Sequence, residues 1–577
     1  NISKVTACPI EMRNSIGIVD SDEQYCLITS AQSPYAVQTE LAQLFKVDEK
    51  KIRVIAPDVG GSFGMKGGLF REDALVLWAS KRLKRPVCWL SERSEAFLSD
   101  EYARAVSGSA SLGLDDNGNF TSLWVDAYID AGAYLSRRTK SLVNNIGGIA
   151  GQYTTPNIAG ELTFYFTNTM QTAPYRGAGR PEATFIIERL IDKAAKEIGK
   201  DALSLRLQNL IQPDAMPYQT PLSFKYDSGN FPLIVQTAAK KANYQDFVTR
   251  RVSSENKGLL RGIGIANPIE VAGGPIKQLK KDVARLTAKP DGQILIAPGF
   301  MSVGQGHETT MSRMIAERLG VKLSSIVYEQ GDTKLLPSGR GSGGSASTII
   351  GGSAVHKTLD EFLVSGKKIA AKVMECKTEE IVFDTGYFYD KKDRSKQPMN
   401  WADIASHSNA SEGFSVLSEF LPEDVTYPNG CHICELEIDP NTGYVSFADY
   451  VVVEDVGTVL NADLVEGQMH GGIAQGISQA LGENLKFDQN GQLITGSFLD
   501  YQIPIAADFP FFRISTLPVP TKVNPLGAKG VGEAGTVGAL AATMNAICDA
   551  LACAGVDDFE MPATPSRIWH ALQKAKS

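Results

Sequence analysis

The stretch Gly527-Ala-Lys-Gly-Val-Gly-Glu-Ala-Gly-Thr-Val-Gly538 carries a single carboxylate, Glu533, among five glycines. Glycine reaches backbone angles that other residues avoid, and it lets a main chain lie close to a ligand. The apolar run 539–551 follows directly and is typical of a buried helix. The sequence therefore predicts a carboxylate on a tight loop at a helix N-terminus, where unpaired N–H groups favour an anion. An acid that merely caps its own helix is the competing interpretation.

The overall composition is that of a globular protein with more than one core. A chain of 577 residues exceeds the size at which single cores stop growing, so we expect two or more domains. Its 43% hydrophobic and 21% charged residues are ordinary for a folded protein. A net charge of −8 without a basic block argues against a nucleic-acid partner. No apolar run approaches the roughly 18 residues of a membrane span, so we expect a cytoplasmic protein.

The cysteines do not indicate a disulfide framework or a metal centre. Eight cysteines are too few for a chain of this length, and Cys431-His-Ile-Cys434 is the only close pair. A zinc or iron–sulfur site needs about four ligands, and there is no second such pair. We interpret the pair as structural. If electrons leave this protein, the iron–sulfur relay must lie on another chain.

Glycine is the notable excess, and its 54 residues gather in several loops. Three loops are predicted to lead into helix N-termini, which are ready anion sites: 302–309, 338–347 and 467–476. They would suit the phosphates of a large, extended cofactor gripped by backbone from several sides. None has the Walker A or the Rossmann spacing.

The remaining pattern indicates a mixed α+β fold with several mixed-sheet subdomains. Strand–turn–strand units recur at 106–129, 282–297 and 432–453, and the clearest helix spans 181–198. A polar stretch near 230–258 marks our expected boundary. We therefore predict two domains, 1–240 and 241–577.

With these loops in view, the chain resembles the molybdenum-binding large subunit of the xanthine dehydrogenase/aldehyde oxidase family. Five motifs occur in the family's order, among them Pro9-Ile-Glu-Met-Arg13, Gly60-Gly-Ser-Phe-Gly64 and Ala173-Pro-Tyr-Arg-Gly-Ala-Gly-Arg180. The family's usual N-terminal region is missing from this sequence, and a separate chain could supply it. The resemblance covers essentially all 577 residues.

The resemblance implies roles for particular residues. Glu533 matches the catalytic base, Gln32 the glutamine beside the metal's oxo group, and Arg176 the active-site arginine, although a purely structural arginine remains an alternative. The residues expected to bind the cofactor are Gly61, Phe63, Gly64, Gln305, Gly306, Gly344, Ser345, Ser347, Gln468 and Gly532. The metal, held by the pterin dithiolene, would take no protein ligand and would lie near Gln32, Phe63, Arg176 and Glu533. His307 and His470 could touch phosphate, but solvated histidines are the simpler interpretation.

The implied reaction is hydroxylation at an electron-poor carbon with water as the oxygen source. A buried carboxylate such as Glu533 can take the proton of the attacking oxygen, and we expect desolvation to raise its pKa toward the working range. No second acid lies nearby in the sequence to compete with it. The neutral amide of Gln32 can orient an oxo group, and Arg176 can stabilise developing negative charge.

Differences from the named family members restrict the class of substrate that we expect. Xanthine-oxidising members have an acid and an arginine that bind the purine, and the resemblance places Gly67 and Ala159 at these positions. An aromatic residue of those members is replaced by Ala178. The copper-holding cysteine of carbon monoxide dehydrogenases is replaced by Gly177. We therefore expect an N-heteroaromatic substrate, with an aldehyde oxidoreductase or a carbon monoxide dehydrogenase-like chain as alternatives. A non-catalytic cofactor-holding subunit is the alternative from another class.

The resemblance also implies the rest of the assembly. The expected cofactor is molybdopterin, in its cytosine dinucleotide form, with molybdenum. [2Fe-2S] clusters and FAD are expected only on partners, a small and a medium subunit, in a dimer of heterotrimers.

Overall fold

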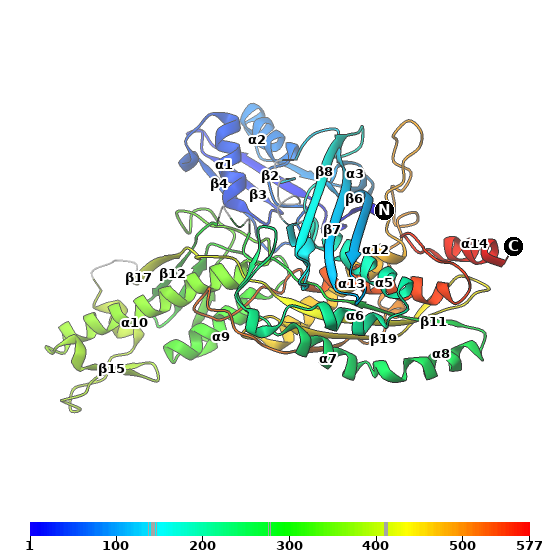
Figure 1. The fold of residues 1–577 in the computed structure, drawn as a ribbon. Helices are drawn as coiled ribbons and strands as arrows, with labels where there is room; N and C mark the ends of the chain where they lie inside the picture. The colour runs from blue at the N-terminus through cyan, green and yellow to red at the C-terminus, as the bar shows by residue number, and fades with distance from the viewer. Residues whose placement is uncertain are drawn as a thin grey trace.

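The structure is a computed structural model that describes residues 1–136, 138–139, 145, 147–274, 276, 279–408 and 413–576. Helices and sheets are mixed along the whole chain, as expected for an α+β protein. Among the described residues the strands form four four-stranded sheets and two small two-stranded ones. Figure 1 shows the N-terminal segment at the top, a broad central layer below it, and an arm that extends to one side.

The N-terminal sheet has the order β4-β3-β2-β5, and helices α1 and α2 pack against it. A buried cluster built around Leu27, Leu41 and Leu77 joins the sheet to both helices. The elements are β2 Asn14–Val19, β3 Tyr25–Thr29, α1 Pro34–Phe45, β4 Ile52–Ile55, α2 Arg71–Leu83 and β5 Val87–Leu90. The loop that carries Gly60–Gly64 follows β4, so this small sheet holds one wall of the later site.

The second sheet, β1-β6-β7-β8, stands beside the first (Figure 1). Its long hairpin follows the alternation of the sequence, since Leu123, Val125 and Ala127 are buried while Trp124 is half exposed. The elements are β1 Ile2–Thr6, α3 Arg93–Ser99, β6 Tyr102–Leu114, β7 Phe120–Gly132, β8 Asn157–Phe166, α5 Arg180–Glu197 and α6 Ala202–Asn209.

The central layer consists of the sheet β11-β18-β19-β20 covered by the apolar helix α13. Glycines let the two surfaces meet, because a Cβ on Gly262 or Gly264 of β11 would overlap the backbone of α13 at Ala546 and Ala542. The elements are β9 Tyr218–Gln219, β10 Lys225–Tyr226, α7 Phe231–Lys241, α8 Phe247–Glu255, β11 Leu260–Ala266, β18 Asn429–Ile438, β19 Val445–Asp455, α12 Ala462–Leu481, β20 Arg513–Thr516, α13 Ala534–Ala552 and α14 Pro565–Lys576.

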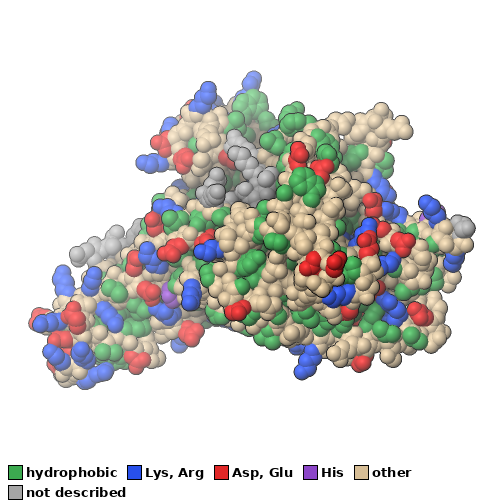
Figure 2. Space-filling view, viewed as in Figure 1, with side chains coloured by type: hydrophobic (Ala, Val, Ile, Leu, Met, Phe, Trp, Pro, Cys, Tyr) green, Lys and Arg blue, Asp and Glu red, His purple; other side chains and the backbone are tan. Residues whose placement is uncertain are grey.

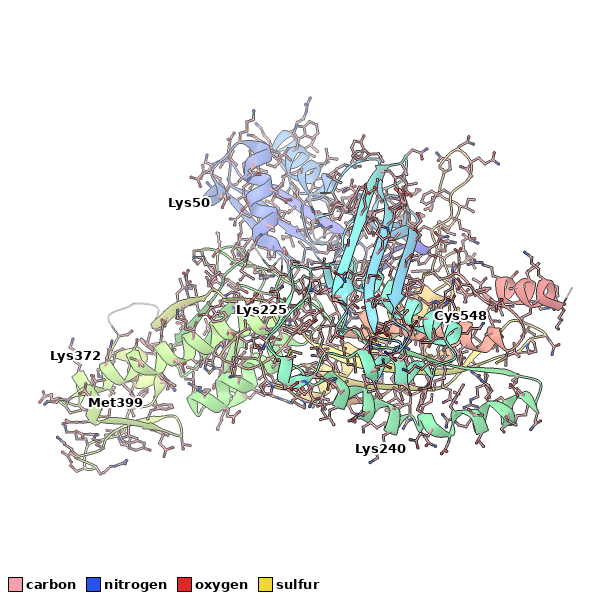
Figure 3. The ribbon with its side chains drawn as sticks, viewed as in Figure 1. Lys50, Lys225, Lys240, Lys372, Met399 and Cys548 are labelled. Atoms are coloured by element: carbon pink, nitrogen blue, oxygen red, sulfur yellow. The ribbon has the colours of Figure 1, made fainter. Side chains whose placement is uncertain are left out.

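Helix α13 is long and apolar enough to cross a membrane, which the sequence analysis did not expect. However, 94% of its apolar stretch is buried inside the molecule, so it is the core helix of the central layer. Cys548 lies on it (Figure 3). The pair Cys431 and Cys434 is likewise buried on β18, and both thiols are free.

The fourth sheet, β14-β13-β12-β17, packs with α9 and α10 and leads into the projecting arm. The arm's core gathers Phe362, Phe388 and Trp401, and Met399 (labelled in Figure 3) belongs to the same cluster. Figure 2 shows charges of both signs over its outer end. The elements are β12 Asp282–Ala288, β13 Ile294–Pro298, α9 His307–Leu319, β14 Ile326–Tyr328, α10 Ser353–Val373, β15 Ile381–Asp384, β16 Tyr387–Asp390, α11 Trp401–Ser406 and β17 Phe414–Phe420.

One expectation about local structure was wrong. The stretch 467–476 does not lead into a helix but lies inside α12, which begins at Ala462 because the side chain of Asn461 caps it. Two of its glycines serve packing, since a Cβ on Gly472 would lie 3.0 Å from the backbone of α13 at Gly535 and one on Gly476 would lie 2.7 Å from Ala539. The polar stretch 230–258 is largely the helices α7 and α8.

Candidate active site

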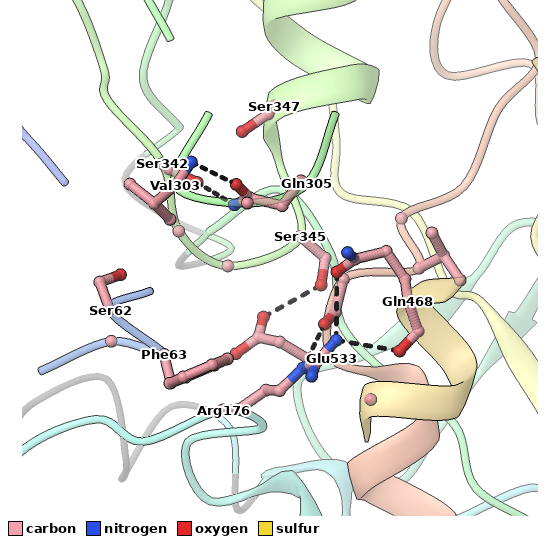
Figure 4. Close-up of a pocket in the computed structure, with 18 of the residues that line it drawn as sticks. Ser62, Phe63, Arg176, Val303, Gln305, Ser342, Ser345, Ser347, Gln468 and Glu533 are labelled. Carbon is pink, nitrogen blue, oxygen red and sulfur yellow. Dashed lines mark hydrogen bonds between the residues drawn. The ribbon is translucent and has the colours of Figure 1, made fainter. Parts of the chain in front are cut away.

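A cavity of about 1320 Å³ lies where the glycine-rich loops converge (Figure 4). Twelve of the thirteen predicted site residues line it: Gln32, Gly61, Phe63, Gly64, Arg176, Gln305, Gly344, Ser345, Ser347, Gln468, Gly532 and Glu533. Gly306 is the exception. It caps the N-terminus of α9 in a left-handed conformation, and its missing side chain makes room for Leu464.

The Glu533 carboxylate faces segments from distant parts of the chain rather than its own helix. It occupies the N-cap position of α13, but its side chain does not cap that helix. Its Oε1 accepts the N–H of Gly177 at 2.9 Å, and its Oε2 accepts the hydroxyl of Ser345 at 3.0 Å. Arg180 Nη2 lies 2.6 Å from the same Oε2. The interpretation of Glu533 as a simple helix cap is therefore wrong.

The expected direction of the Glu533 pKa is also wrong. Burial alone raises the pKa of this carboxyl, as the sequence argument assumed. The Arg180 guanidinium, the Gly177 N–H and the Ser345 hydroxyl outweigh burial, and together they hold the pKa of Glu533 below its ordinary value. Glu533 is thus an ionised carboxylate, ready to accept a proton.

Sequence reasoning missed two residues beside Glu533, namely Arg180 and Glu270. Arg180 begins α5, is 2% exposed, and also places its Nη1 2.7 Å from Glu270 Oε1. Arg180 stood within the quoted motif, four residues after Arg176, without being given a role. The only signal for Glu270 is its isolation as a lone acid in the apolar run Ile265–Ala272. A second acid therefore does lie near Glu533 in space, although none lies near it in the sequence.

Arg176 connects three parts of the cavity wall. Its Nε donates to the carbonyl of Gly532 at 2.6 Å, and its Nη1 donates to Gln475 Oε1 at 3.1 Å. Its Nη2 donates to both the carbonyl and the side-chain oxygen of Gln468, at 3.0 and 3.1 Å (Figure 4). A guanidinium has five N–H donors, so these bonds occupy four of them. The arginine mainly positions the Glu533 loop against α12.

Gln32 is held at both ends of its amide. Its Nε2 donates to the carbonyl of Ser342 at 2.7 Å, and its Oε1 accepts the hydroxyl of Ser62 at 2.6 Å. An amide nitrogen has two N–H donors, so one stays available on the cavity side. In the adjoining loop, Phe63 has a φ of 51° and its carbonyl accepts the N–H of Arg176 at 2.9 Å. The motifs Gly60–Gly64 and Ala173–Arg180 of the resemblance thus meet directly.

The loop before α9 is ordered by its own glutamine. Gln305 accepts the N–H of Val303 at 2.6 Å and donates to the hydroxyl of Ser342 at 2.7 Å (Figure 4). His307 is not solvated: it is 8% exposed, and burial lowers its pKa to about 4, so it is neutral. His470 faces away from the cavity lining and lies 3.6 Å from Glu466.

The positions that were compared with substrate contacts do not all lie in the cavity. Gly67 and Ala178 line it, and a Cβ on Gly67 would overlap the guanidinium of Arg138. Ala159, by contrast, lies on β8 paired with Trp124, exposed and away from the cavity lining. Its identity therefore carries no information on the substrate, and that part of the argument was wrong.

The cavity fits a large anionic group that brings its own metal ligands. Its described lining contains six Lys or Arg side chains, Arg138, Arg176, Arg180, Lys280, Arg340 and Lys529, and the carboxylates Glu483 and Glu533. At Gly304, with φ of 117°, an added Cβ would meet no atom within 4 Å, so the backbone leaves open space there. Among the described residues no cluster of three His, Cys, Asp or Glu could hold a metal ion.

A cavity walled by glycine loops from two halves of the chain is what a large cofactor such as molybdopterin requires, and the family comparisons identify that class. The molybdopterin cofactor-binding domain matches residues 1–210 and again residues 237–510. The chain belongs to this family, as a large subunit of the molybdenum hydroxylases, which are molybdenum-dependent oxidoreductases.

Several relatives share nearly the whole chain. The carbon monoxide dehydrogenase large chain of Hydrogenophaga pseudoflava is 30% identical, covering 99% of this chain and 74% of the relative. The nicotine 6-hydroxylase large subunit of Paenarthrobacter nicotinovorans is 30% identical, with 99% and 72% covered. The crystal structure of quinoline 2-oxidoreductase from Pseudomonas putida 86 superposes with a TM-score of 0.93 at 31% identity, covering 99% of this chain and 75% of that one.

Proposed function

We propose that this chain hydroxylates an electron-poor carbon of an N-heteroaromatic compound, with water as the oxygen source. The observation that carries the proposal is the placement of Glu533, which lines the cavity as a carboxylate held ionised by Arg180, Gly177 and Ser345. When bound, the molybdenum cofactor would supply the oxygen to be transferred and accept the electrons of the substrate. The residues around it would supply the proton transfer and the positioning.

The chain's own residues divide these tasks. Glu533 would take the proton from the attacking oxygen, as a positioned carboxylate can. Gln32 would offer its remaining N–H to the cofactor, with its amide held in place by Ser342 and Ser62. Arg176 would keep the Glu533 loop in place through the Gly532 carbonyl, since that bond fixes the residue directly before the base. The loops with Gln305, Ser347 and Gln468 would hold the pterin and phosphates.

A ring substrate is supported by the pocket and by the relatives. Ala178, two residues after Arg176, leaves room where a larger side chain would close the cavity. The relatives include a nicotine hydroxylase and a quinoline oxidoreductase. Carbon monoxide oxidation is disfavoured because Gly177 has no thiol, and a Cβ there would overlap Pro181.

We further propose the cytosine dinucleotide form of the cofactor, and partner subunits that carry [2Fe-2S] clusters and FAD. The relatives are named as large chains or subunits of complexes, which supports a multi-subunit assembly. The test is dye reduction by the purified complex with a panel of N-heterocycles, aldehydes and carbon monoxide, together with molybdenum and nucleotide analysis. Turnover confined to aldehydes or carbon monoxide would contradict the heterocycle proposal.

A further inference from the structure

Two buried carboxylates share the single guanidinium of Arg180. Nη2 lies 2.6 Å from Glu533 Oε2, and Nη1 lies 2.7 Å from Glu270 Oε1. The other bonds of Arg180 fix its plane, because Nε donates to the carbonyl of Gly177 at 2.6 Å and Nη1 donates to that of Val271 at 2.5 Å. The guanidinium therefore cannot turn toward one carboxylate without leaving the other.

Glu270 lies behind this arginine, outside the cavity. It is 1% exposed and does not line the cavity, so it touches neither substrate nor cofactor. Its N–H is bonded to the carbonyl of Pro428, and among the described residues its Oε2 has no hydrogen-bond partner. Glu533 alone would neutralise Arg180, so Glu270 is a second buried carboxylate on the same guanidinium, and a buried carboxylate that is half unsatisfied is costly.

We propose that Glu270 is a positioning residue for the base: by sharing Arg180 with Glu533, it weakens the hold of the guanidinium on the Glu533 carboxylate and makes Glu533 a better proton acceptor. The inference rests on the proposed role of Glu533 as the base. Without Glu270, a carboxylate bound to a buried guanidinium would be a poor base, because its charge would be fully compensated.

The charged surroundings determine the direction of each effect. Glu533 faces Arg180, Arg176 and Glu270, and it accepts bonds from Ser345 and Gly177. Glu270 faces Arg180 and Arg176 as cations and Glu533 and Glu454 as acids, with the Ser345 hydroxyl also close. Burial raises the pKa of Glu270 to about 7, so Glu270 carries its negative charge, and weakens the hold of Arg180 on Glu533, only above that pH. Removing the positive charge of Arg180 must raise the pKa of Glu533.

The test compares Glu270→Gln and Arg180→Met in the intact complex, through the pH dependence of kcat/KM. We expect the wild-type rate to rise a second time as Glu270 ionises near pH 7, and Glu270→Gln to lose that second rise and keep the lower rate. In Arg180→Met the acid limb should move to higher pH by about one pH unit. Glu188→Gln is the matched control, because it disturbs an equally buried pair with Arg206, at 2.8 Å, outside the site. It should leave the profile unchanged. A second rise near pH 7 that persists in Glu270→Gln would overturn the proposal.

A second readout does not depend on turnover. Infrared titration follows the carboxylate band that disappears in Glu533→Gln, and this band should shift near pH 7, as Glu270 ionises, in the wild type but not in Glu270→Gln. Should Arg180→Met fail to assemble, the near-isosteric Glu270→Gln decides alone: a band shift that persists in this variant would overturn the proposal. If wild-type turnover proves indifferent to Glu533, the proposed function fails, whereas the band shift still reports whether Glu270 acts on Glu533.

Discussion

The carboxylate of Glu533 lies 2.6 Å from the guanidinium of Arg180, although the two residues belong to helices from different halves of the chain. The same carboxylate accepts a backbone N–H from Gly177, 356 residues away in sequence. These contacts convert a loop acid into an ionised group at the wall of a large cavity. We derive predictions for Glu533, for Gly177, for the buried pair Lys529 and Asp455, and for the neutral His307.

Replacing Glu533 should stop turnover without loss of the cofactor. Glu533→Gln keeps the size of the side chain but removes the proton acceptor, so we expect kcat to fall by about 10²–10⁴-fold. Molybdenum content should stay near that of the wild type, because Glu533 is not among the residues that we expect to hold the cofactor. Dye-reduction kinetics and metal analysis measure both. Glu483→Gln removes the other carboxylate of the lining. A loss of turnover in Glu483→Gln together with full activity in Glu533→Gln would refute the assignment of Glu533 as the base.

Gly177 should tolerate no side chain. Its φ is 99°, and a Cβ would overlap Pro181, so Gly177→Ala should destabilise the protein by ~1–3 kcal/mol. Because its N–H holds Glu533 Oε1, turnover should fall as well. Denaturation and dye reduction check the two effects. Gly496→Ala is the control, since an added Cβ meets nothing within 4 Å there. Equal stability of both variants would contradict the prediction.

The pair Lys529 and Asp455 should matter strongly for stability. Lys529 Nζ lies 2.6 Å from Asp455 Oδ2, and both side chains are fully buried. Lys529→Met leaves an uncompensated buried carboxylate, which typically costs about 3–5 kcal/mol. The measurement is the free energy of unfolding in urea. Combining Lys529→Met with Asp455→Asn should restore part of the loss, and a single-variant effect below ~1 kcal/mol would show that the pair is dispensable.

His307 should make the protein sensitive to mild acid. Its pKa is lowered to about 4 in the folded chain, against an ordinary value of about 6.5 for the unfolded chain. A depressed pKa gives stability that is complete above pH ~6.5 and is lost as the pH falls toward 4. At pH 5.5 the loss from this residue is ~1.4 kcal/mol. His307→Asn should remove that part of the acid sensitivity, as judged by unfolding curves at pH 7 and 5.5. Identical pH dependence in both proteins would contradict it.

Much of the fold was predictable because it depends on local pattern. The helices 181–198 and 539–551 were recognised from their apolar spacing and flanking residues, and the structure has α5 and α13 there. The prediction failed where one local signal, a run of glycines, is compatible both with a loop and with close packing of two helices. The glycines of 467–476 were interpreted as a loop, but they lie inside α12, where Gly472 and Gly476 permit close packing on α13.

By itself, the sequence determined the family, the motifs and the residues that would line a common cavity, since these are properties of residue type and spacing. Only the tertiary structure decided the state of the base. Burial acts on Glu533 in the direction that the sequence suggested, but Arg180 and the N–H of Gly177 act in the opposite direction and prevail. The sign of a buried group's pKa shift depends on which charges lie within a few ångströms of it, and chain folding alone brings those charges together.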